Sequence, residues 1–427
     1  MEAIGKYRWV IVTLLFFATT INYIDRQVIG LLKPILAKEF SWDERDYGYI
    51  VMAFQACYAF GLLIFGKITD RIGTKKGYSL SILVWSGAAM LHAVVRSTFG
   101  FGIARAALGL GESGNFPVAI KSVAEWFPKK ERAFATGIFN SGTNIGAVIA
   151  PVMVPLVMAI YGWRGAFIVT GALGFVWLIF WLIFYEVPSR QQRLKKPEYA
   201  YIHSDPDEIA ELKNTTPLSW MQLLSYRQTW VFVAGKFLTD PIWWFFLFWL
   251  PDYFNGTFHL DLSRPGWALV LVYSATSLGS IGGGYLSSLL IAKGWPVARA
   301  RKFSMLVFAI CVLPVVTARY ATSLWVVASL ISLAAAAHQA WSATIFTTAS
   351  DMFPKKAVSS VVGIGGMAGA LGGVLFPLLV SNILEYFQNT GNKTAGYNII
   401  FVICGFAYLF AWLLMHFLMP RTKRITG

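Results

Sequence analysis

Charged residues are scarce in this chain. Asp, Glu, Lys and Arg make up 13% of its 427 residues, against 56% for hydrophobic residues. Soluble domains carry roughly 25% charged residues, so the composition excludes a chain of soluble domains. Apolar stretches of about 20 residues recur, and each is long enough to cross the hydrocarbon core of a bilayer. Because lipid offers the backbone no hydrogen bonds, we expect each stretch to form a helix.

Cysteine is rare as well. Cys57, Cys311 and Cys404 are scattered through apolar stretches and have no metal-ligand spacing. We therefore expect no disulfide framework, no metal and no other cofactor, and we interpret the three as small apolar residues. The chain also lacks a nucleophile motif and a sizeable polar domain, which argues against an enzyme. No small-residue cleavage site follows the first apolar run, so we expect a span there and not a cleaved signal peptide.

The apolar stretches predict an all-α membrane protein with twelve spans. Their expected ranges are 8–31, 47–69, 78–95, 98–120, 134–158, 163–185, 229–253, 265–291, 301–318, 322–348, 358–384 and 395–418.

The basic residues behind the net charge of +15 are divided unevenly between the two sides of the expected membrane. With the N-terminus inside, basic residues gather in the inner loops, for example at Lys67, Lys75, Lys129 and Lys130, and thin out in the outer loops. This is the positive-inside rule, so we expect a multi-pass protein of the inner (plasma) membrane, in contact with lipid, with both termini cytoplasmic. The charge is thus interpreted as an orienting signal, and a nucleic-acid partner is the lesser alternative.

Two polar loops repeat one pattern. Residues 125–137 read EWFPKKERAFATG and residues 351–363 read DMFPKKAVSSVVG, at a spacing of 351 − 125 = 226, about half the chain. A parallel repeat predicts two six-helix halves, as in the major facilitators, related by an axis along the membrane normal. We place the halves at residues 1–185 and 229–427, with a cytoplasmic linker at 186–228. Residues 207–213 of this linker form either a short amphipathic helix or a solvated spacer.

The repeat also predicts a cavity between the halves, near the midplane. In the first span, Tyr23 and Arg26 share a helix face, and the guanidinium of Arg26 is a planar fork suited to a carboxylate. Asp25 points about 100° aside. A charge inside a membrane is costly unless it is paired or faces water. We therefore expect Arg26 to bind an anionic substrate and Asp25 to carry a proton; the alternative is that both satisfy neighbouring helices.

The fourth span carries Arg105 and Glu112. Their spacing of two turns puts them on one helix face. Burial would favour the protonated form of Glu112, and a nearby Arg105 would oppose it. We expect Glu112 to carry protons and Arg105 to help bind the substrate, unless the two form a static ion pair. The same offset of 226 maps Glu112 onto His338, so we expect the two at equivalent depths on opposite walls.

Polar and aromatic residues of the second half are candidates for hydroxyl recognition. Lys236 and Asp240 are an i, i+4 pair in the seventh span, and Trp243 and Trp244 follow them. The two tryptophans either stack on the apolar face of a sugar ring or pack against lipid and neighbouring helices. Further polar residues complete the expected substrate site: His338, Gln339, Ser342, Thr143, Asn144 and Tyr58.

The loop between the second and third spans contains a candidate gate. Residues 66–77 read GKITDRIGTKKG, which resembles the signature G-x-x-x-D-R-x-G-x-K/R-K/R of the major facilitators. Gly66 and Gly73 permit close packing and tight turning. We expect Asp70 and Arg71 to pair across helix ends as a cytoplasmic latch that breaks when the inner side opens. A simple basic loop that orients the chain is the alternative.

Several motifs together resemble the anion:cation symporter branch of the major facilitators. They are Tyr-x-Asp-Arg at 23–26, Arg-x₆-Glu at 105–112 and Trp-Phe-Pro-x-x-Glu-Arg at 126–132. Within that branch, residues 237–243 (FLTDPIW) and 337–342 (AHQAWS) look like the hexuronate transporters, which import glucuronate and galacturonate. The resemblance covers essentially the whole chain.

This resemblance implies roles for single residues. Asp25 and Glu112 match the proton-carrying carboxylates of the branch, and Arg26 with Tyr23 and Tyr58 matches its grip on the substrate carboxylate. Thr143 stands where galactonate carriers have Gln, which argues against an aldonate substrate.

We therefore expect a secondary active transporter, acting as a monomer, that imports a small organic anion. The resemblance implies a hexuronate, carried with protons by alternating access. Three alternatives stay open: a symporter of an aldonate or another carboxylate, an anion exchanger or uniporter on the same fold, and a transporter-like sensor that binds without flux.

Overall fold

The computed structural model describes residues 5–42, 44–205, 218–248, 250–258, 267–389, 391, 393–419 and 425. Regular structure in these ranges is helical throughout. The expected alternatives for residues 207–213 fall outside the described residues.

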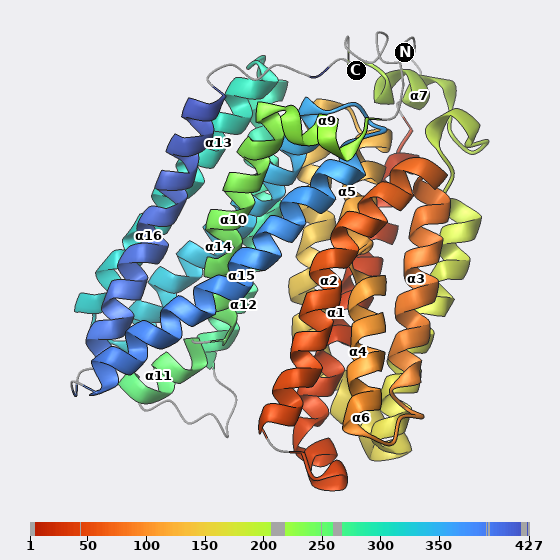
Figure 1. Ribbon diagram of the computed structural model, residues 1–427. Helices are drawn as coiled ribbons and strands as arrows, with labels where there is room; N and C mark the ends of the chain where they lie inside the picture. The colour runs from red at the N-terminus through yellow and green to blue at the C-terminus, as the bar shows by residue number, and fades with distance from the viewer. Residues whose placement is uncertain are drawn as a thin grey trace.

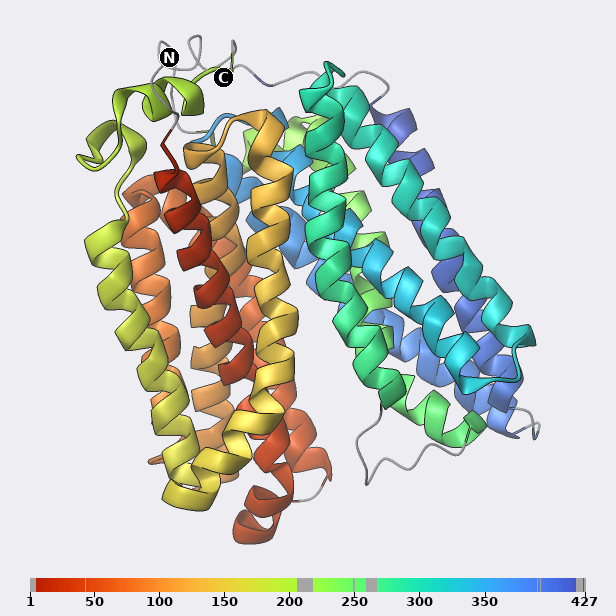
Figure 2. The same ribbon diagram turned by 180° about the vertical axis from the view of Figure 1, so that it is seen from behind.

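The helices form two groups that stand side by side (Figures 1 and 2). The first group, called the N-terminal half, contains α1 (Tyr7–Phe40), α2 (Glu44–Ile72), α3 (Thr74–Leu91), α4 (Thr98–Glu112), α5 (Asn115–Trp126) and α6 (Lys129–Phe184). The second, called the C-terminal half, contains α10 (Arg227–Phe248), α11 (Leu250–Phe258), α12 (Trp267–Ala292), α13 (Val297–Val312), η2 (Leu313–Tyr320), α14 (Leu324–Met352), α15 (Val358–Asn389) and α16 (Lys393–Leu418).

Three short elements lie between the halves in sequence. They are η1 (Pro188–Arg190), α7 (Lys196–Ile202) and α9 (Trp220–Ser225). They lie on the side where α1 begins and α16 ends, which we call the terminal side (Figure 1). Glu198 of α7 joins this segment to α1, because its carboxylate accepts hydrogen bonds from the backbone N–H groups of Tyr7 at 3.0 Å and Arg8 at 3.1 Å.

The twelve expected spans are represented by helices among the described residues, but not all as single helices; the ninth, for example, continues from α13 into the 3-10 helix η2. The fourth is divided into α4 and α5, because Pro117 has no N–H to donate to the carbonyl of Ser113 one turn earlier. The fifth and sixth are both part of α6, which turns at Gly162 with φ 69°. Only glycine adopts such a left-handed conformation without strain, so the chain can reverse there.

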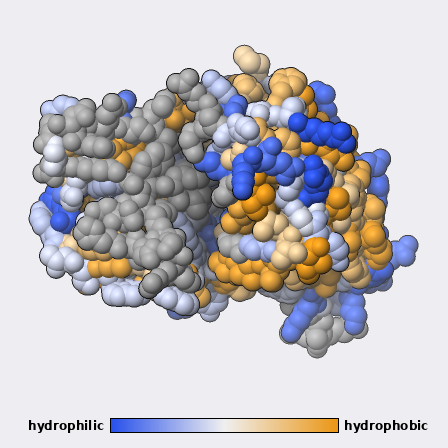
Figure 3. All heavy atoms as spheres, turned by 90° about the horizontal axis from the view of Figure 1, so that it is seen from below, coloured by the Kyte–Doolittle hydropathy of each residue, from blue (hydrophilic) through white to orange (hydrophobic). Residues whose placement is uncertain are grey.

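Eight described helical segments are long and apolar enough to span a membrane by length and composition alone. Large apolar side chains cover the flanks of the described surface, for example Phe17, Phe60, Leu278 and Phe417. Seen from the side opposite the termini, hydrophilic residues gather on the end of the N-terminal half while hydrophobic residues extend along its flanks (Figure 3). This pattern is that of a protein whose sides face lipid.

Glycines let α4 lie deep inside the N-terminal half. A Cβ on Gly109 would collide with the backbone of Phe54 in α2, and one on Gly111 would collide with Trp85 in α3. Small residues at such contacts are how membrane helices approach closely, since lipid supplies little hydrophobic drive between them. The close packing places Arg105 and Glu112, which are both on α4, next to α1.

The two halves meet mainly along two pairs of helices, α2 with α15 and α6 with α12. Glycines lie at both contacts: a Cβ on Gly66 or Gly363 would strike the facing backbone of α15 or α2, and one on Gly137 or Gly284 that of α12 or α6. These residues lie nearer the terminal side than the midpoints of their helices. From there the helices of the two halves diverge toward the opposite side (Figures 1 and 2).

Candidate functional site

A cavity lies between the two halves, beyond the close contacts of the terminal side. It is lined from the N-terminal half by Tyr23, Arg26, Tyr58, Leu62, Phe116, Asn140 and Thr143, and from the C-terminal half by Lys236, Asp240, Trp243, Trp244, His338, Gln339, Ser342, Phe346, Val362, Gly366 and Ala370. The lining combines charged, polar and aromatic side chains, a composition that suits a small polar ligand with apolar faces.

Arg26 is the fixed cation on the N-terminal wall. Its Nε lies 2.9 Å from Oε2 of Glu112, whose side chain is fully buried behind it. The guanidinium packs over the rings of Tyr23 and Tyr58, each 4.7 Å from the ring centroid. The Nη2 atom of Arg26 has no hydrogen-bond partner among the described residues. One edge of the fork is therefore held by Glu112, while the Nη2 donor is buried and lacks a partner among the described residues.

Asp25 and Arg105 lie behind this wall and do not line the cavity. Asp25 is 2% exposed, and neither carboxylate oxygen has a hydrogen-bond partner among the described residues. Arg105 donates to the backbone carbonyl of Arg26 at 3.3 Å and packs over the ring of Phe54 at 4.5 Å. Arg105 does not line the cavity in this arrangement, because α4 is packed too deeply for its side chain to reach it, and its contact with the substrate stays a prediction.

The C-terminal wall carries a second charge pair. Nζ of Lys236 lies 2.7 Å from Oδ2 of Asp240 and 4.2 Å from the ring centroid of Phe346. Both residues line the cavity, as their i, i+4 spacing on one face of α10 allows.

His338 is held in a polar and aromatic setting on the same wall. Its ring stacks on that of Trp243 with centroids 5.6 Å apart, and its Nδ1 is hydrogen-bonded with the hydroxyl of Tyr408. Glu112, its counterpart in the repeat, is buried behind Arg26. The two were expected at equivalent depths on opposite walls; His338 lines the C-terminal wall, whereas Glu112 lies behind Arg26 on the N-terminal wall.

Asn140 is a site residue that the sequence reasoning missed. Its Nδ2 donates to Oε1 of Gln339 at 2.9 Å and to the hydroxyl of Ser280 at 3.0 Å, which joins the halves at the cavity floor. Thr143, one turn further along α6, also lines the cavity, whereas Asn144 points elsewhere. The signal was available, because Asn140 and Thr143 are three apart and share a helix face.

The gate on the terminal side differs from the expected Asp70–Arg71 pair. Oδ1 of Asp70 lies 2.8 Å from Nζ of Lys121, and Oδ2 accepts a hydrogen bond of 2.8 Å from the backbone N–H of Ser360. Ser360 is in the first turn of α15, so Asp70 does connect the halves and faces a helix N-terminus. Arg71 is exposed, because adjacent residues on a helix point about 100° apart.

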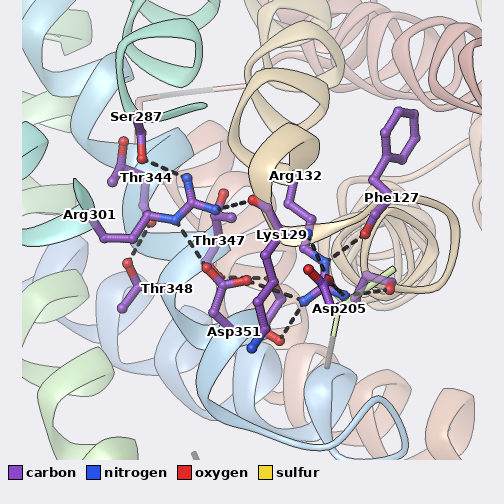
Figure 4. Close-up of polar contacts among 12 residues, drawn as sticks. Phe127, Lys129, Arg132, Asp205, Ser287, Arg301, Thr344, Thr347, Thr348 and Asp351 are labelled. Atoms are coloured by element: carbon purple, nitrogen blue, oxygen red, sulfur yellow. Dashed lines mark hydrogen bonds and ion pairs between the residues drawn. The ribbon is translucent and has the colours of Figure 1, made fainter. Parts of the chain in front are cut away.

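A second connection on the terminal side is centred on Asp351 (Figure 4). Its carboxylate accepts from Nη1 of Arg132 at 3.2 Å and from Nε of Arg301 at 3.0 Å. Arg301 also donates to the backbone carbonyl of Lys129 at 2.8 Å. All three charged side chains are nearly fully buried, with exposed fractions of 6% for Asp351, 1% for Arg132 and 2% for Arg301. The group ties α14 and α13 of one half to α6 of the other.

The repeated loops thus have different partners. Glu125, the counterpart of Asp351, accepts hydrogen bonds from the hydroxyls of Thr74 at 2.8 Å and Tyr185 at 2.7 Å, both in its own half. The sequence repeat identifies both acids but not their partners, because each partner lies far from its acid in the sequence.

The chain is similar to known proteins over most of its length. The family model of the Major Facilitator Superfamily matches residues 15–377. The chain is 31% identical to the hexuronate transporter of Escherichia coli (strain K12) over 386 residues, which cover 90% of this chain and 89% of that protein. It is 33% identical to the galacturonate transporter of Dickeya chrysanthemi over 289 residues, 68% of this chain and 84% of that protein.

Solved structures support the same fold. The Escherichia coli fucose:proton symporter superposes with a TM-score of 0.71 at 14% identity, covering 97% of this chain and 99% of that one. A proton:xylose symporter also gives a TM-score of 0.71, at 15% identity, covering 98% of this chain and 97% of that one.

Proposed function

Because the chain belongs to the Major Facilitator Superfamily, and is therefore a multi-pass membrane transporter and not an enzyme, we propose that it imports a sugar acid, specifically a hexuronate, together with protons. The relatives named for hexuronate and galacturonate transport favour this substrate class. The expected division at residues 185 and 229 into two halves fits the proposal, since alternating access requires two bodies that move relative to each other.

Arg26 is the observation that carries the proposal. A cation on a cavity wall near the membrane midplane needs a counter-charge, and Glu112 occupies only one edge of its fork. The unpartnered Nη2 donor suits a substrate carboxylate. Tyr23 and Tyr58, which flank the guanidinium, would fix the orientation of the anion.

The rest of the cavity suits the hydroxylated part of a hexuronate. Gln339, Ser342 and Thr143 supply donors and acceptors for hydroxyl groups. Trp243 and Trp244 provide flat apolar surfaces of the kind on which sugar rings pack. A plain aliphatic acid would leave the polar groups unsatisfied, which is the physical basis for discrimination against it.

Glu112 and Asp25 are the proposed proton sites. When a substrate carboxylate reaches Arg26, Glu112 loses part of its counter-charge, and protonation then becomes the cheaper way to keep it buried. Asp25, with both oxygens unpartnered, would be costly to keep ionised in its buried position. Neutral carboxyl groups lower the cost of closing the loaded cavity, so substrate and proton move together.

The terminal side is proposed to be cytoplasmic, in the inner membrane. Lys67, Lys75, Lys76, Lys129 and Lys130 lie at the helix ends on this side, in agreement with the positive-inside rule. The ties at Asp70 and Asp351 would then hold the inner side shut, so that this conformation would receive substrate from outside.

Uptake into proteoliposomes with an imposed pH gradient tests the proposal. We expect labelled glucuronate and galacturonate to accumulate when the outside is acidic, and unlabelled sugar acids to compete. Glu112→Gln removes a titratable proton site while retaining a polar side chain, so accumulation driven by the pH gradient should be lost. Substrate exchange at equal pH should persist.

Two results would overturn parts of the proposal separately. Failure of both hexuronates to move or compete would refute the substrate. Uptake that ignores the pH gradient, with Glu112→Gln as active as the unchanged protein, would refute proton coupling and favour a uniporter or exchanger. Glu186→Gln is a matched control, because Glu186 pairs with Lys75 at 3.1 Å in a partly exposed position far from the cavity.

A further inference from the structure

The ion pair on the C-terminal wall has no part in the scheme above. Lys236 and Asp240 both line the cavity, yet Arg26 is proposed to bind the substrate carboxylate and Glu112 and Asp25 to carry protons. The two side chains differ in access: that of Lys236 is 5% exposed and that of Asp240 is 20% exposed. The carboxylate of Asp240 is therefore more accessible to a ligand than the ammonium of Lys236.

Packing fixes the position of this pair. The ammonium of Lys236 lies over the ring of Phe346, and its Nζ is 2.7 Å from Asp240. On the other side, Asp240 lies against α15 so closely that a Cβ on Gly369 would collide with its Oδ2 atom. The absence of a side chain at Gly369 leaves the space in which the carboxylate stays beside Lys236.

Basic and acidic side chains occur in equal number around the cavity. Three bases and three acids lie on its walls and directly behind them: Arg26, Arg105, Lys236, Asp25, Glu112 and Asp240. Among the described residues that line the cavity, Arg26 and Lys236 are the arginine and lysine side chains. A ligand with two carboxylates would need both, but Lys236 is already neutralised by Asp240.

We propose that Asp240 determines specificity: by neutralising Lys236 it restricts the cavity to sugar acids with one carboxylate and excludes aldarates, which have one at each end. This inference rests on the proposed function as a sugar-acid transporter. With one carboxylate on Arg26, the other end of an aldarate meets the negative charge of Asp240. Like charges brought together at a binding site cost several kcal/mol.

A hydroxyl group beside the Lys236–Asp240 pair, in contrast, is accepted. It can donate to the carboxylate of Asp240 and accept from the ammonium of Lys236, so the ion pair matches both of its hydrogen-bonding roles. The pair thus selects by repulsion as well as by attraction, which is how discrimination between similar ligands is commonly achieved.

Competition against labelled glucuronate, with the full-length protein in proteoliposomes, tests the proposal. Gluconate and glucarate are the informative competitors, because they share an open carbon chain and differ in whether the far end is a hydroxymethyl or a carboxylate group. For the unchanged protein, the inhibition constant of glucarate should exceed that of gluconate by about tenfold or more. Asp240→Asn frees the charge of Lys236, so this ratio should fall by about tenfold and glucarate should bind better in absolute terms.

Lys236→Met is the paired variant. It removes the cation and leaves Asp240 unneutralised, so binding of glucarate should weaken further. General damage to the cavity would weaken every ligand in both variants, and only the proposed role predicts a gain for glucarate in Asp240→Asn. If Asp240→Asn does not fold, Gly369→Ala provides a second test, because its methyl group displaces the carboxylate from Lys236 and should lower the same ratio.

The outcomes separate this inference from the proposed function. If the unchanged protein binds none of the sugar acids, the substrate class falls and the inference falls with it. If it binds glucuronate but has equal affinities for glucarate and gluconate, only the inference is refuted. An unchanged ratio in folded Asp240→Asn also refutes it. Glu186→Gln again serves as the acid-to-amide control and should leave the ratio unaltered.

Discussion

Arg26 and Arg105 illustrate how position decides the role of a single side chain. Both are arginines within membrane-spanning helices of the N-terminal half, and both are near Glu112. Arg26 lines the cavity and has an Nη2 donor without a partner among the described residues, whereas Arg105 is 4% exposed and donates to the backbone carbonyl of Arg26 in α1. Arg105 therefore positions the residue that is proposed to bind the substrate.

Substitution of Arg26 by lysine tests the proposed carboxylate site. Arg26→Lys keeps the positive charge but loses the planar fork, so Glu112 and a substrate carboxylate can no longer be bound by separate edges. Loss of one buried charged hydrogen bond typically costs about 2–5 kcal/mol, so we expect the Kd for glucuronate to rise at least about tenfold. Isothermal titration of the purified protein measures this change.

Arg164→Lys is the matched control for that measurement. Arg164 pairs with Glu39 at 3.3 Å, and its side chain is 52% exposed, far from the cavity. Its substitution should leave the Kd unchanged. Equal affinities in Arg26→Lys and Arg164→Lys would contradict a fork-dependent carboxylate site.

At the level of elements, α12 shows how glycine allows two halves to touch. Three consecutive glycines occur in this helix, Gly282, Gly283 and Gly284. A Cβ on Gly284 would strike the backbone of Ala133 in α6, and one on Gly283 would strike Ala340 in α14, whereas one on Gly282 would meet nothing within 4 Å. The same helix therefore carries glycines that are required for contact and one that is not.

This difference gives a comparison within one helix. Gly284→Ala should separate α12 from α6 and hinder closure of the terminal side, so uptake should fall severalfold and the melting temperature should drop. Gly282→Ala should be neutral or stabilising by about 0.5–1 kcal/mol, because alanine is the better helix former. Thermal unfolding and uptake of both variants check this, and similar effects at the two positions would show that contact with α6 is unimportant.

At the scale of the whole molecule, buried charge pairs hold the halves together on one side. Asp351 connects Arg132 of the N-terminal half with Arg301 of the C-terminal half, and Asp70 caps the first turn of α15. Such buried pairs contribute little net stability, because removing the charges from water is costly. These pairs do favour one arrangement of the two halves. When the halves move apart, contacts with water can replace the contacts within each pair.

Loss of Asp351 should shift the population toward a state that is open on the terminal side. Asp351→Asn leaves the charges of Arg132 and Arg301 buried and uncompensated, and breaking one partner of such a pair typically costs about 3–5 kcal/mol. Spin labels at exposed Lys76 and Lys293, in a background without the native cysteines, should report a longer distance between the halves. Glu186→Gln breaks a pair between the N-terminal half and the start of the linker, so it should not alter the distance. An unchanged distance in Asp351→Asn would rule out this role.

Much of the architecture could be predicted from the sequence. Apolar length predicted the spans, because a backbone in lipid must satisfy its own hydrogen bonds within a helix. Helical periodicity likewise indicated that Tyr23 and Arg26, and Lys236 and Asp240, share faces, and these four residues line the cavity.

Other features depended on tertiary structure. Asp70 pairs with Lys121 across 51 residues instead of with adjacent Arg71, and Asp351 meets Arg132 across 219 residues. Helical periodicity fixes where a side chain points relative to its own helix axis. Which neighbour it then meets depends on how each helix is rotated and how closely it approaches the next, and this is decided by small residues such as Gly109 and Gly284 that lie at the contacts. The sequence by itself thus determined the spans, the repeat and the charged residues, whereas packing alone decided that Arg26 faces the cavity, that Arg105 lies behind it and that Asp240 neutralises Lys236.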